Sequence, residues 1–197
     1  MTVDHSSLPS SLAEMAALGQ LFDAHRPRLL AMLERRIDPR LHVRLDPQEV
    51  LSEVFVLAGR KWADFKTQTH FSPYAWLYRL ALDCLFEAWR RETRDCRDLR
   101  KELPMPDGSS LQLGLGLIHT GTSPSEAVAR DELCGKVQQC LAMLKPADRE
   151  ILWMRHNDQL TFAEAGAVLG LSENTATVRY ARALRRMKEI WERVFDE

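Results

Sequence analysis

The chain has 197 residues, of which 45% are hydrophobic and 28% charged, an ordinary composition for a protein that buries a core. Its 27 Lys and Arg residues are balanced by 28 Asp and Glu, so the net charge at pH 7 is -1. This balance excludes a basic field over the whole molecule, and any nucleic-acid-binding surface must be local. No apolar run approaches the roughly 20 residues that span a membrane, and the N-terminal residues lack a secretory-signal pattern. We therefore expect a cytoplasmic protein with no membrane insertion.

No catalytic or metal-binding motif stands out. The six histidines are scattered, without HExxH spacing, and neither a GxSxG motif nor a phosphate-binding glycine loop is present. We expect no enzymatic activity, no metal and no cofactor. The cysteines never occur in CxxC spacing, and we expect all four to be reduced thiols: Cys84, Cys96, Cys134 and Cys140.

Apolar residues recur every three or four positions, while strand-like alternation is scarce, which predicts an all-α fold. After an N-terminal tail (1–17), a first helix runs up to Asp38-Pro39. Further helices begin at Asp46-Pro47 and at Ser72-Pro73, where a capping side chain precedes a first-turn proline. The expected core positions are Leu18, Phe22, His25, Leu29, Met32, Leu33, Val50, Leu51, Val54, Ala58, Trp62, Trp76, Leu77, Leu80, Ala81, Cys84, Leu85 and Ala88.

The helical pattern stops over residues 102–124, where Gly, Pro and Ser concentrate. This segment predicts a flexible linker between two small helical domains, 18–101 and 125–197. Its centre is too apolar for a fully solvated tether. We therefore hypothesise that the linker docks on a domain through four leucines: Leu111, Leu113, Leu115 and Leu117.

Residues 161–188 have the pattern of two short helices joined by a tight turn. Thr161 and Glu164 suit a capping box at the start of the first helix. Gly170 suits the left-handed residue that ends this helix, and Ser172 can cap the second. The second helix, residues 173–187, has small polar side chains early and arginines later. This arrangement predicts a helix-turn-helix that binds DNA.

We expect the second helix to separate base reading from phosphate binding. Glu173 would accept from a cytosine amino group, Asn174 would pair with adenine, and Thr177 would contact a thymine methyl. The arginines would hold the DNA backbone, and they are Arg179, Arg182, Arg185 and Arg186. The alternative is a solvated amphipathic helix whose arginines only lie along its surface.

Three segments carry a shared pattern: DPQEVLSEVF at 46–55, FSPYAWLYRLALDCLFEAWRR at 71–91, and LKPADREILWMRHNDQLTFAEAGAVLGLSENTATVRYARALRRM at 144–187. In this order and spacing they resemble the bacterial RNA polymerase sigma factors of the extracytoplasmic-function (ECF) group, in the sigma-70 family. The resemblance implies a transcription initiation factor whose partners are core RNA polymerase and promoter DNA. An anti-sigma factor is a further candidate partner.

The same resemblance implies roles for each domain. The helix-turn-helix would read the minus-35 element. Residues 46–55 would dock on the clamp helices of the polymerase's largest subunit through Asp46, Glu49, Ser52, Glu53 and Phe55. The helix that begins at Pro73 would open the minus-10 element, offering aromatic faces and cations to the separated strand. Its residues for this role are Tyr78, Asp83, Phe86, Trp89, Arg90, Arg91 and Arg94. The alternatives are that the acidic face is merely solvated and that the aromatic side chains all pack.

Three positions depart from the family pattern. Ser52 replaces a usual Gln, and Asp83 replaces a common Asn near the strand-opening segment. Ala165-Gly166 replaces a bulky aliphatic residue and Ala, and a glycine inside a helix costs about 1 kcal/mol relative to Ala.

Two other functions remain open at this point. One is a stand-alone helix-turn-helix regulator, dimeric on a palindromic operator and independent of polymerase. The other is a helical protein-interaction module that never contacts DNA.

Overall fold

The computed structural model describes residues 11–37, 44–67, 72–94 and 124–195. Within these ranges it contains eight helices and no strand, which confirms the all-α prediction. The chain divides into two compact units, Met1–Pro106 and Asp107–Glu197. The division falls within the segment predicted as a linker. The docking hypothesis for Leu111, Leu113, Leu115 and Leu117 concerns residues outside the described ranges.

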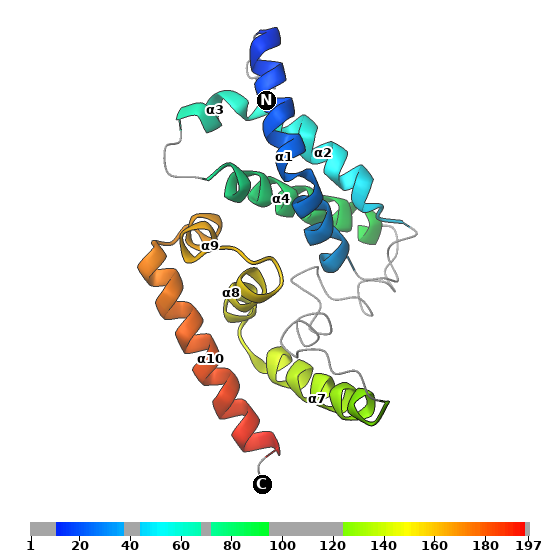
Figure 1. Ribbon diagram of the computed structural model, residues 1–197, viewed down its shortest axis with the longest axis vertical. Coiled ribbons are helices and arrows are strands. Elements are labelled where there is room, and N and C mark those ends of the chain that lie inside the picture. The colour runs from blue at the N-terminus through cyan, green and yellow to red at the C-terminus, as the bar shows by residue number, and fades with distance from the viewer. Residues whose placement is uncertain (1–10, 38–43, 68–71, 95–123, 196–197) are drawn as a thin grey trace. The chain divides into compact units, whose positions relative to one another are not determined.

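The first unit is built on α1 (Leu12–Arg36), α2 (Pro47–Arg60) and α4 (Pro73–Arg94), with the short α3 (Trp62–Thr67) following α2 (Figure 1). Each of the three long helices packs against the other two. Every position predicted to face this core is buried except His25, which is partly exposed.

Side-chain caps explain where these helices begin. The hydroxyl of Ser72 accepts from the backbone N–H of Ala75 (3.2 Å), and the carboxylate of Asp46 accepts from that of Gln48 (2.8 Å). The helix α1 begins at Leu12, earlier than the predicted start at Leu18, because Ser11 caps it in the same way through the N–H of Glu14. The apolar residues of its first turn, Leu12 and Met15, are exposed, so this turn is not part of the buried face.

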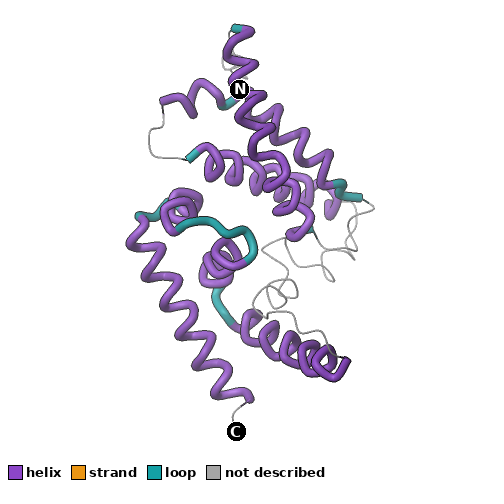
Figure 2. Tube along the Cα trace, in the orientation of Figure 1, coloured by secondary structure: helices purple, strands orange, loops and turns teal. Residues whose placement is uncertain are grey.

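The second unit comprises α7 (Pro124–Met143), α8 (Pro146–His156), α9 (Phe162–Leu169) and α10 (Glu173–Phe195). The helix α10 packs against the other three. Figure 2 shows the short loops that join α8 to α9 and α9 to α10. Trp153 is 1% exposed, and around it lie the other core residues, Val137, Cys140, Leu141, Leu144, Ile151, Leu152, Ala176, Ala183 and Ile190.

Candidate nucleic-acid and polymerase interfaces

The turn between α9 and α10 forms as the sequence predicts. The N–H of Thr161 donates to the carboxylate of Glu164 (2.8 Å), while the N–H of Glu164 donates to the Thr161 hydroxyl (3.1 Å), which completes the capping box. Gly170 ends α9 in the left-handed region at φ 67°. The Ser172 hydroxyl then accepts from the N–H of Thr175 (3.2 Å) and caps α10. The left-handed Gly170 and the Ser172 cap therefore fix the angle at which α10 leaves α9.

Gly166 is required by the close approach of α9 to this turn. A Cβ at position 166 would lie 2.9 Å from the carbonyl oxygen of Leu171 and 3.3 Å from backbone atoms of Ser172. The N–H of Leu171 donates to the carbonyl of Gly166 (2.8 Å), which holds the two segments together. The departure from the family pattern that costs helix propensity thus has a packing reason.

The start of α10 exposes the three predicted base-reading residues, Glu173, Asn174 and Thr177. The hydroxyl of Thr177 donates to the carbonyl of Glu173 (2.9 Å) within the helix. Because that hydroxyl is already used, Thr177 offers chiefly its methyl group, which agrees with the expected thymine contact.

The four predicted phosphate-binding arginines differ in their surroundings. Arg182 and Arg185 are exposed, and among the residues that the structure describes neither forms an ion pair. Arg179 is partly buried. Arg186 forms an ion pair with Asp148, a buried carboxylate in the first turn of α8. A buried carboxylate needs a cation partner, so Arg186 fastens α10 to α8, and its contact with phosphate stays a prediction.

A cluster of side chains from α8 and α9 holds Tyr180 of α10 in place. The Tyr180 hydroxyl and His156 Nε2 are hydrogen-bonded at 2.9 Å, and the ring of Phe162 meets Tyr180 edge-on at 5.3 Å. The guanidinium of Arg155 lies 4.2 Å from the centre of the Phe162 ring. Burial, assisted by the charge of Arg155, lowers the pKa of His156, so its imidazole is neutral at pH 7 and can accept from Tyr180.

Tyr78 is wrongly assigned to the minus-10 surface. Its side chain is 0% exposed, and its hydroxyl accepts a hydrogen bond from the guanidinium of Arg36, itself 1% exposed. A ring enclosed in this way cannot stack on a base. Of the remaining aromatic residues predicted for this role, Phe86 and Trp89 are partly exposed.

The charged residues predicted for the minus-10 surface are exposed. They are Asp83, Arg90 and Arg91. Arg90 lies 3.7 Å from Glu87, a long ion pair on the surface of α4. The side chain of Arg94 lies outside the described part of the chain.

Arg91 and Glu53 were assigned to two different surfaces, yet they contact each other. One guanidinium nitrogen of Arg91 donates to both carboxylate oxygens of Glu53, at 2.6 and 2.8 Å. This hydrogen bond, with the charge of Glu53, raises the pKa of Arg91. The predicted polymerase face on α2 and the predicted DNA face on α4 therefore share an ion pair.

The predicted polymerase-binding residues divide into exposed and structural ones. Glu49 and Ser52 are exposed on α2. Asp46 caps α2. Phe55 is partly buried, and its ring meets that of Phe22 on α1 edge-on at 5.0 Å, so Phe55 mainly holds α1 against α2.

Two grooves flank the exposed side of α2, and Ser52 and Val56 line both of them. Of these two residues, Val56 is absent from the sequence prediction. One groove, about 530 Å³, is formed with α4 and includes Glu53, Asp83, Cys84 and Glu87. The other, about 360 Å³, is formed with α1. Val56 lines both grooves and is 52% exposed. Its signal was available, because it is an aliphatic residue out of phase with the buried stripe of α2.

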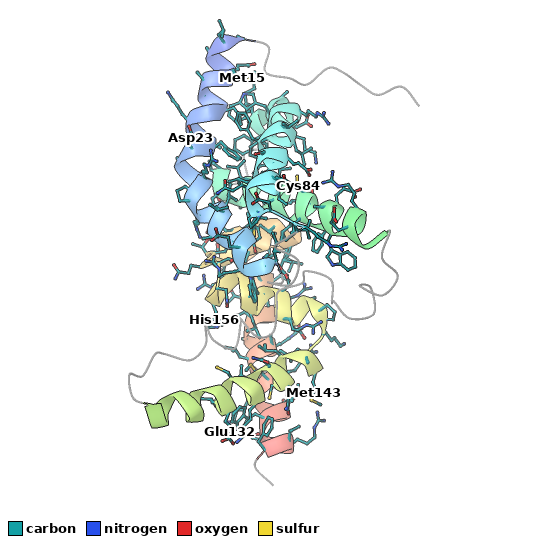
Figure 3. All side chains as sticks on the ribbon, turned by 90° about the vertical axis from the view of Figure 1, so that its right-hand side faces the viewer. Met15, Asp23, Cys84, Glu132, Met143 and His156 are labelled. Carbon is teal, nitrogen blue, oxygen red and sulfur yellow. The ribbon has the colours of Figure 1, made fainter. Side chains whose placement is uncertain are left out.

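Neither a metal site nor a membrane span is found in the described ranges. They contain no group of three or more His, Cys, Asp or Glu placed to hold a metal ion. None of their helices is both long and apolar enough to cross a bilayer. Cys84 lies on α4 (Figure 3), where burial, with the charges of Glu53 and Asp83, raises its thiol pKa to about 11. This thiol is therefore protonated at neutral pH.

Each of the two units matches a known family model. The family model for Sigma-70 region 2 matches residues 21–95, and the model for Sigma-70, region 4 matches residues 134–187. The second match contains α8, α9, the turn after α9 and most of α10. The chain belongs to the sigma-70 family.

Individual relatives of this sigma factor are distant. It is 22% identical over 173 residues to the ECF RNA polymerase sigma factor SigW of Bacillus subtilis, covering 88% of each chain. It is 27% identical over 146 residues to the RNA polymerase sigma factor CnrH of Cupriavidus metallidurans, covering 74% of this chain and 73% of the relative. A solved structure of CnrH in complex with the cytosolic domain of CnrY matches with a TM-score of 0.49 and 22% identity, over 92% of this chain and 94% of that one. The prediction of a sigma factor of the ECF group is confirmed.

Proposed function

We propose that this sigma factor binds core RNA polymerase through α2 and reads the minus-35 element through α10. The observation that best supports the DNA half is the composition of one exposed helix face. It carries polar groups in the first turn of α10 and, further along, Arg182 and Arg185, which pair with no described residue. A helix N-terminus that reads bases, followed by cations for phosphates, is the docking geometry of a helix-turn-helix.

The polymerase half of the proposal rests on the exposed side of α2. Glu49 and Ser52 offer polar contacts to a basic partner, and Val56 offers an apolar one between two grooves. An apolar anchor with a polar surround is the usual anatomy of a protein interface. The clamp helices of the largest polymerase subunit are the expected partner.

For the minus-10 element, we propose that Phe86 and Trp89 stack on separated bases while Arg90 and Arg91 follow the backbone. Arg91 must first leave Glu53. Because an exposed ion pair contributes about 0.2–1 kcal/mol, a phosphate can replace the carboxylate at small cost.

In this function the polymerase supplies catalysis, and this chain supplies sequence preference. A near-neutral sigma factor need not bind DNA tightly alone, since the polymerase raises the effective concentration of both units at the promoter. The cytoplasm, where polymerase and promoters are found, is the proposed location. Control by an anti-sigma factor stays a prediction from the family resemblance.

The testing experiment mixes the purified chain with core polymerase from the native or a close host. We expect a stable complex that initiates at genomic sites sharing two spaced elements. Glu49→Lys should weaken the complex, whereas Arg182→Ala with Arg185→Ala should weaken promoter use and leave the complex intact. Operator binding without any polymerase complex would instead establish a free-standing regulator.

A further inference from the structure

The exposed face of α10 has an apolar centre. Val178, in the second turn, is 41% exposed. Asn174 lies one turn before it and Arg182 one turn after it, on the same side of the helix. Thr177 beside it contributes mainly a methyl group, because its hydroxyl donates to the carbonyl of Glu173. Between the amide of Asn174 and the guanidinium of Arg182, the exposed face of α10 therefore presents methyl groups.

Val178 is not one of the core residues of α10. The core side of α10 consists of Ala176, Ala183 and Ile190, and Val178 lies off this stripe. A β-branched side chain is also a poorer helix former than alanine. Val178 is exposed and is a poorer helix former than alanine, and it lies among the predicted base-reading residues, where its methyl groups are free to contact a base edge.

We infer that Val178 is a specificity-determining residue that selects thymine by contacting its C5-methyl group in the major groove. This inference rests on the proposed reading of duplex DNA by α10. In the major groove thymine is the unmodified base that presents a methyl group, and apolar side chains recognise it there. The first turns of a recognition helix are the part that reaches base edges, and Val178 lies in them.

The same helix supplies a matched control. Val194 is also 41% exposed, but it lies near the far end of α10, away from the turn. Replacing either valine by alanine removes the same atoms and keeps a good helix former. Only the change at Val178 should alter the reading of thymine.

The experiment first selects duplexes from a random library, both with the free full-length chain and with its polymerase complex. Each thymine of the selected element is then replaced singly by deoxyuridine, which removes the C5-methyl alone. With the wild type and with Val194→Ala, one such replacement should weaken binding about fourfold, the effect of one buried methyl. With Val178→Ala the same replacement should have no effect, since the methyl's partner is gone.

The outcomes separate this inference from the proposed function. If the deoxyuridine effect is the same in all three proteins, or absent in all three, Val178 does not read a methyl and the inference falls. A weaker polymerase complex with Val178→Ala, at unchanged thymine preference, would assign Val178 to a protein contact and also overturn it. If the chain selects duplexes but never joins polymerase, the proposed function falls, while the deoxyuridine series in the free chain still decides the role of Val178. Selection of no duplex in either form overturns both.

Discussion

The two surfaces proposed to contact DNA differ in how far their residues are already engaged within the protein. On α10, Arg182 and Arg185 are exposed and have no ion-pair partner in the described ranges. On α4, by contrast, Arg91 is bonded to Glu53 and Arg90 lies near Glu87. Tyr78, predicted for the same surface, is enclosed in the core. The α10 surface is therefore preorganised and exposed. Residues of the α4 surface must instead give up contacts within the protein before they can contact DNA.

This difference follows from how each surface is built. The α10 surface belongs to a single helix, and local caps and the α9–α10 turn fix its direction. The α4 surface lies beside α2, so charges on the two helices pair with each other. Preorganised groups bind with less loss of free energy than groups that must rearrange. Substitutions on α10 should therefore have the larger effects on DNA binding.

The largest effect is expected from removing both open arginines. Arg182→Ala with Arg185→Ala should weaken minus-35-dependent binding roughly 10- to 100-fold, because two charge-assisted contacts to phosphate are lost. The slope of log affinity against log salt should also fall by about 2. Binding of the polymerase complex to duplexes over a salt series measures both quantities.

Arg186→Ala is the matched control for this double variant. It removes a cation from the same helix but leaves Asp148 buried without its partner. Since Arg186 is about half exposed, we expect a loss of roughly 1–3 kcal/mol in stability of the second unit, with little change in the salt slope. A reduced salt slope with unchanged stability would show that Arg186 mainly contacts DNA phosphate.

The second largest effect is expected at Gly166, where α9 approaches the turn that sets the direction of α10. Gly166→Ala should destabilise α9 and α10, because the added Cβ meets the backbone of Leu171 at 2.9 Å. Overpacking of this kind costs about 1–3 kcal/mol, which outweighs a gain of about 1 kcal/mol in helix propensity. Amide hydrogen exchange of the two helices measures the change.

Gly135→Ala in α7 is the control for Gly166→Ala, since nothing lies within 4 Å of a Cβ at that position. It should be neutral or stabilising, by up to about 1 kcal/mol. Equal responses of the two variants would mean that α9 does not need its close approach to the turn.

Sequence patterns predicted the structural features that depend on residues close together in the chain. The buried stripes of α2 and α4, the capping box at Thr161 and the left-handed Gly170 all follow from spacing and local backbone chemistry. For Gly166 the sequence predicts only a cost in helix propensity, because the contact of this position with Leu171 and Ser172 forms only after the chain turns back.

What the sequence could not predict depends on distant partners. Tyr78 is amphipathic, and only packing against Arg36 on α1 decides that it is buried. Arg186 is paired with Asp148 on α8, and Arg91 is paired with Glu53 on α2. Val56 and Val178 are apolar residues outside the buried stripes of their helices, and periodicity alone does not separate such residues from chance exposed ones.

A smaller effect is expected from the pair that connects α2 with α4. A double-mutant cycle of Glu53→Gln and Arg91→Gln should give a coupling of about 0.2–1 kcal/mol in the stability of the first unit, decreasing with added salt. Glu53→Gln alone should strengthen binding of a minus-10 single strand by up to about fivefold, because Arg91 no longer has to leave a carboxylate.

Glu87→Gln is the comparison for that cycle, since the Glu87–Arg90 pair is longer, at 3.7 Å. It should change strand binding less than Glu53→Gln does. Strand binding that is indifferent to Glu53→Gln would remove the contrast between an engaged α4 surface and an open α10 surface.

The smallest effect concerns the hydrogen bond between His156 and Tyr180 of α10 and depends on pH. The pKa of His156 is lowered from 6.5 by burial and by Arg155, so the unfolded chain takes up this proton first as pH falls. The contribution of a neutral His156 is therefore complete above about pH 6.5 and decreases as pH falls through the interval down to the folded pKa.

Acidification to pH 5.5 should accordingly increase opening of α10, measured by hydrogen exchange with correction for the intrinsic pH dependence of exchange. His156→Gln keeps a hydrogen-bonding side chain beside Tyr180 but removes the titration, so its extra opening at low pH should be smaller. Equal opening of the wild type and this variant across the pH range would show that the direction of α10 depends on its caps and turn alone. The open surface of α10 would then be set entirely by local structure, and its contrast with α4 would be sharper.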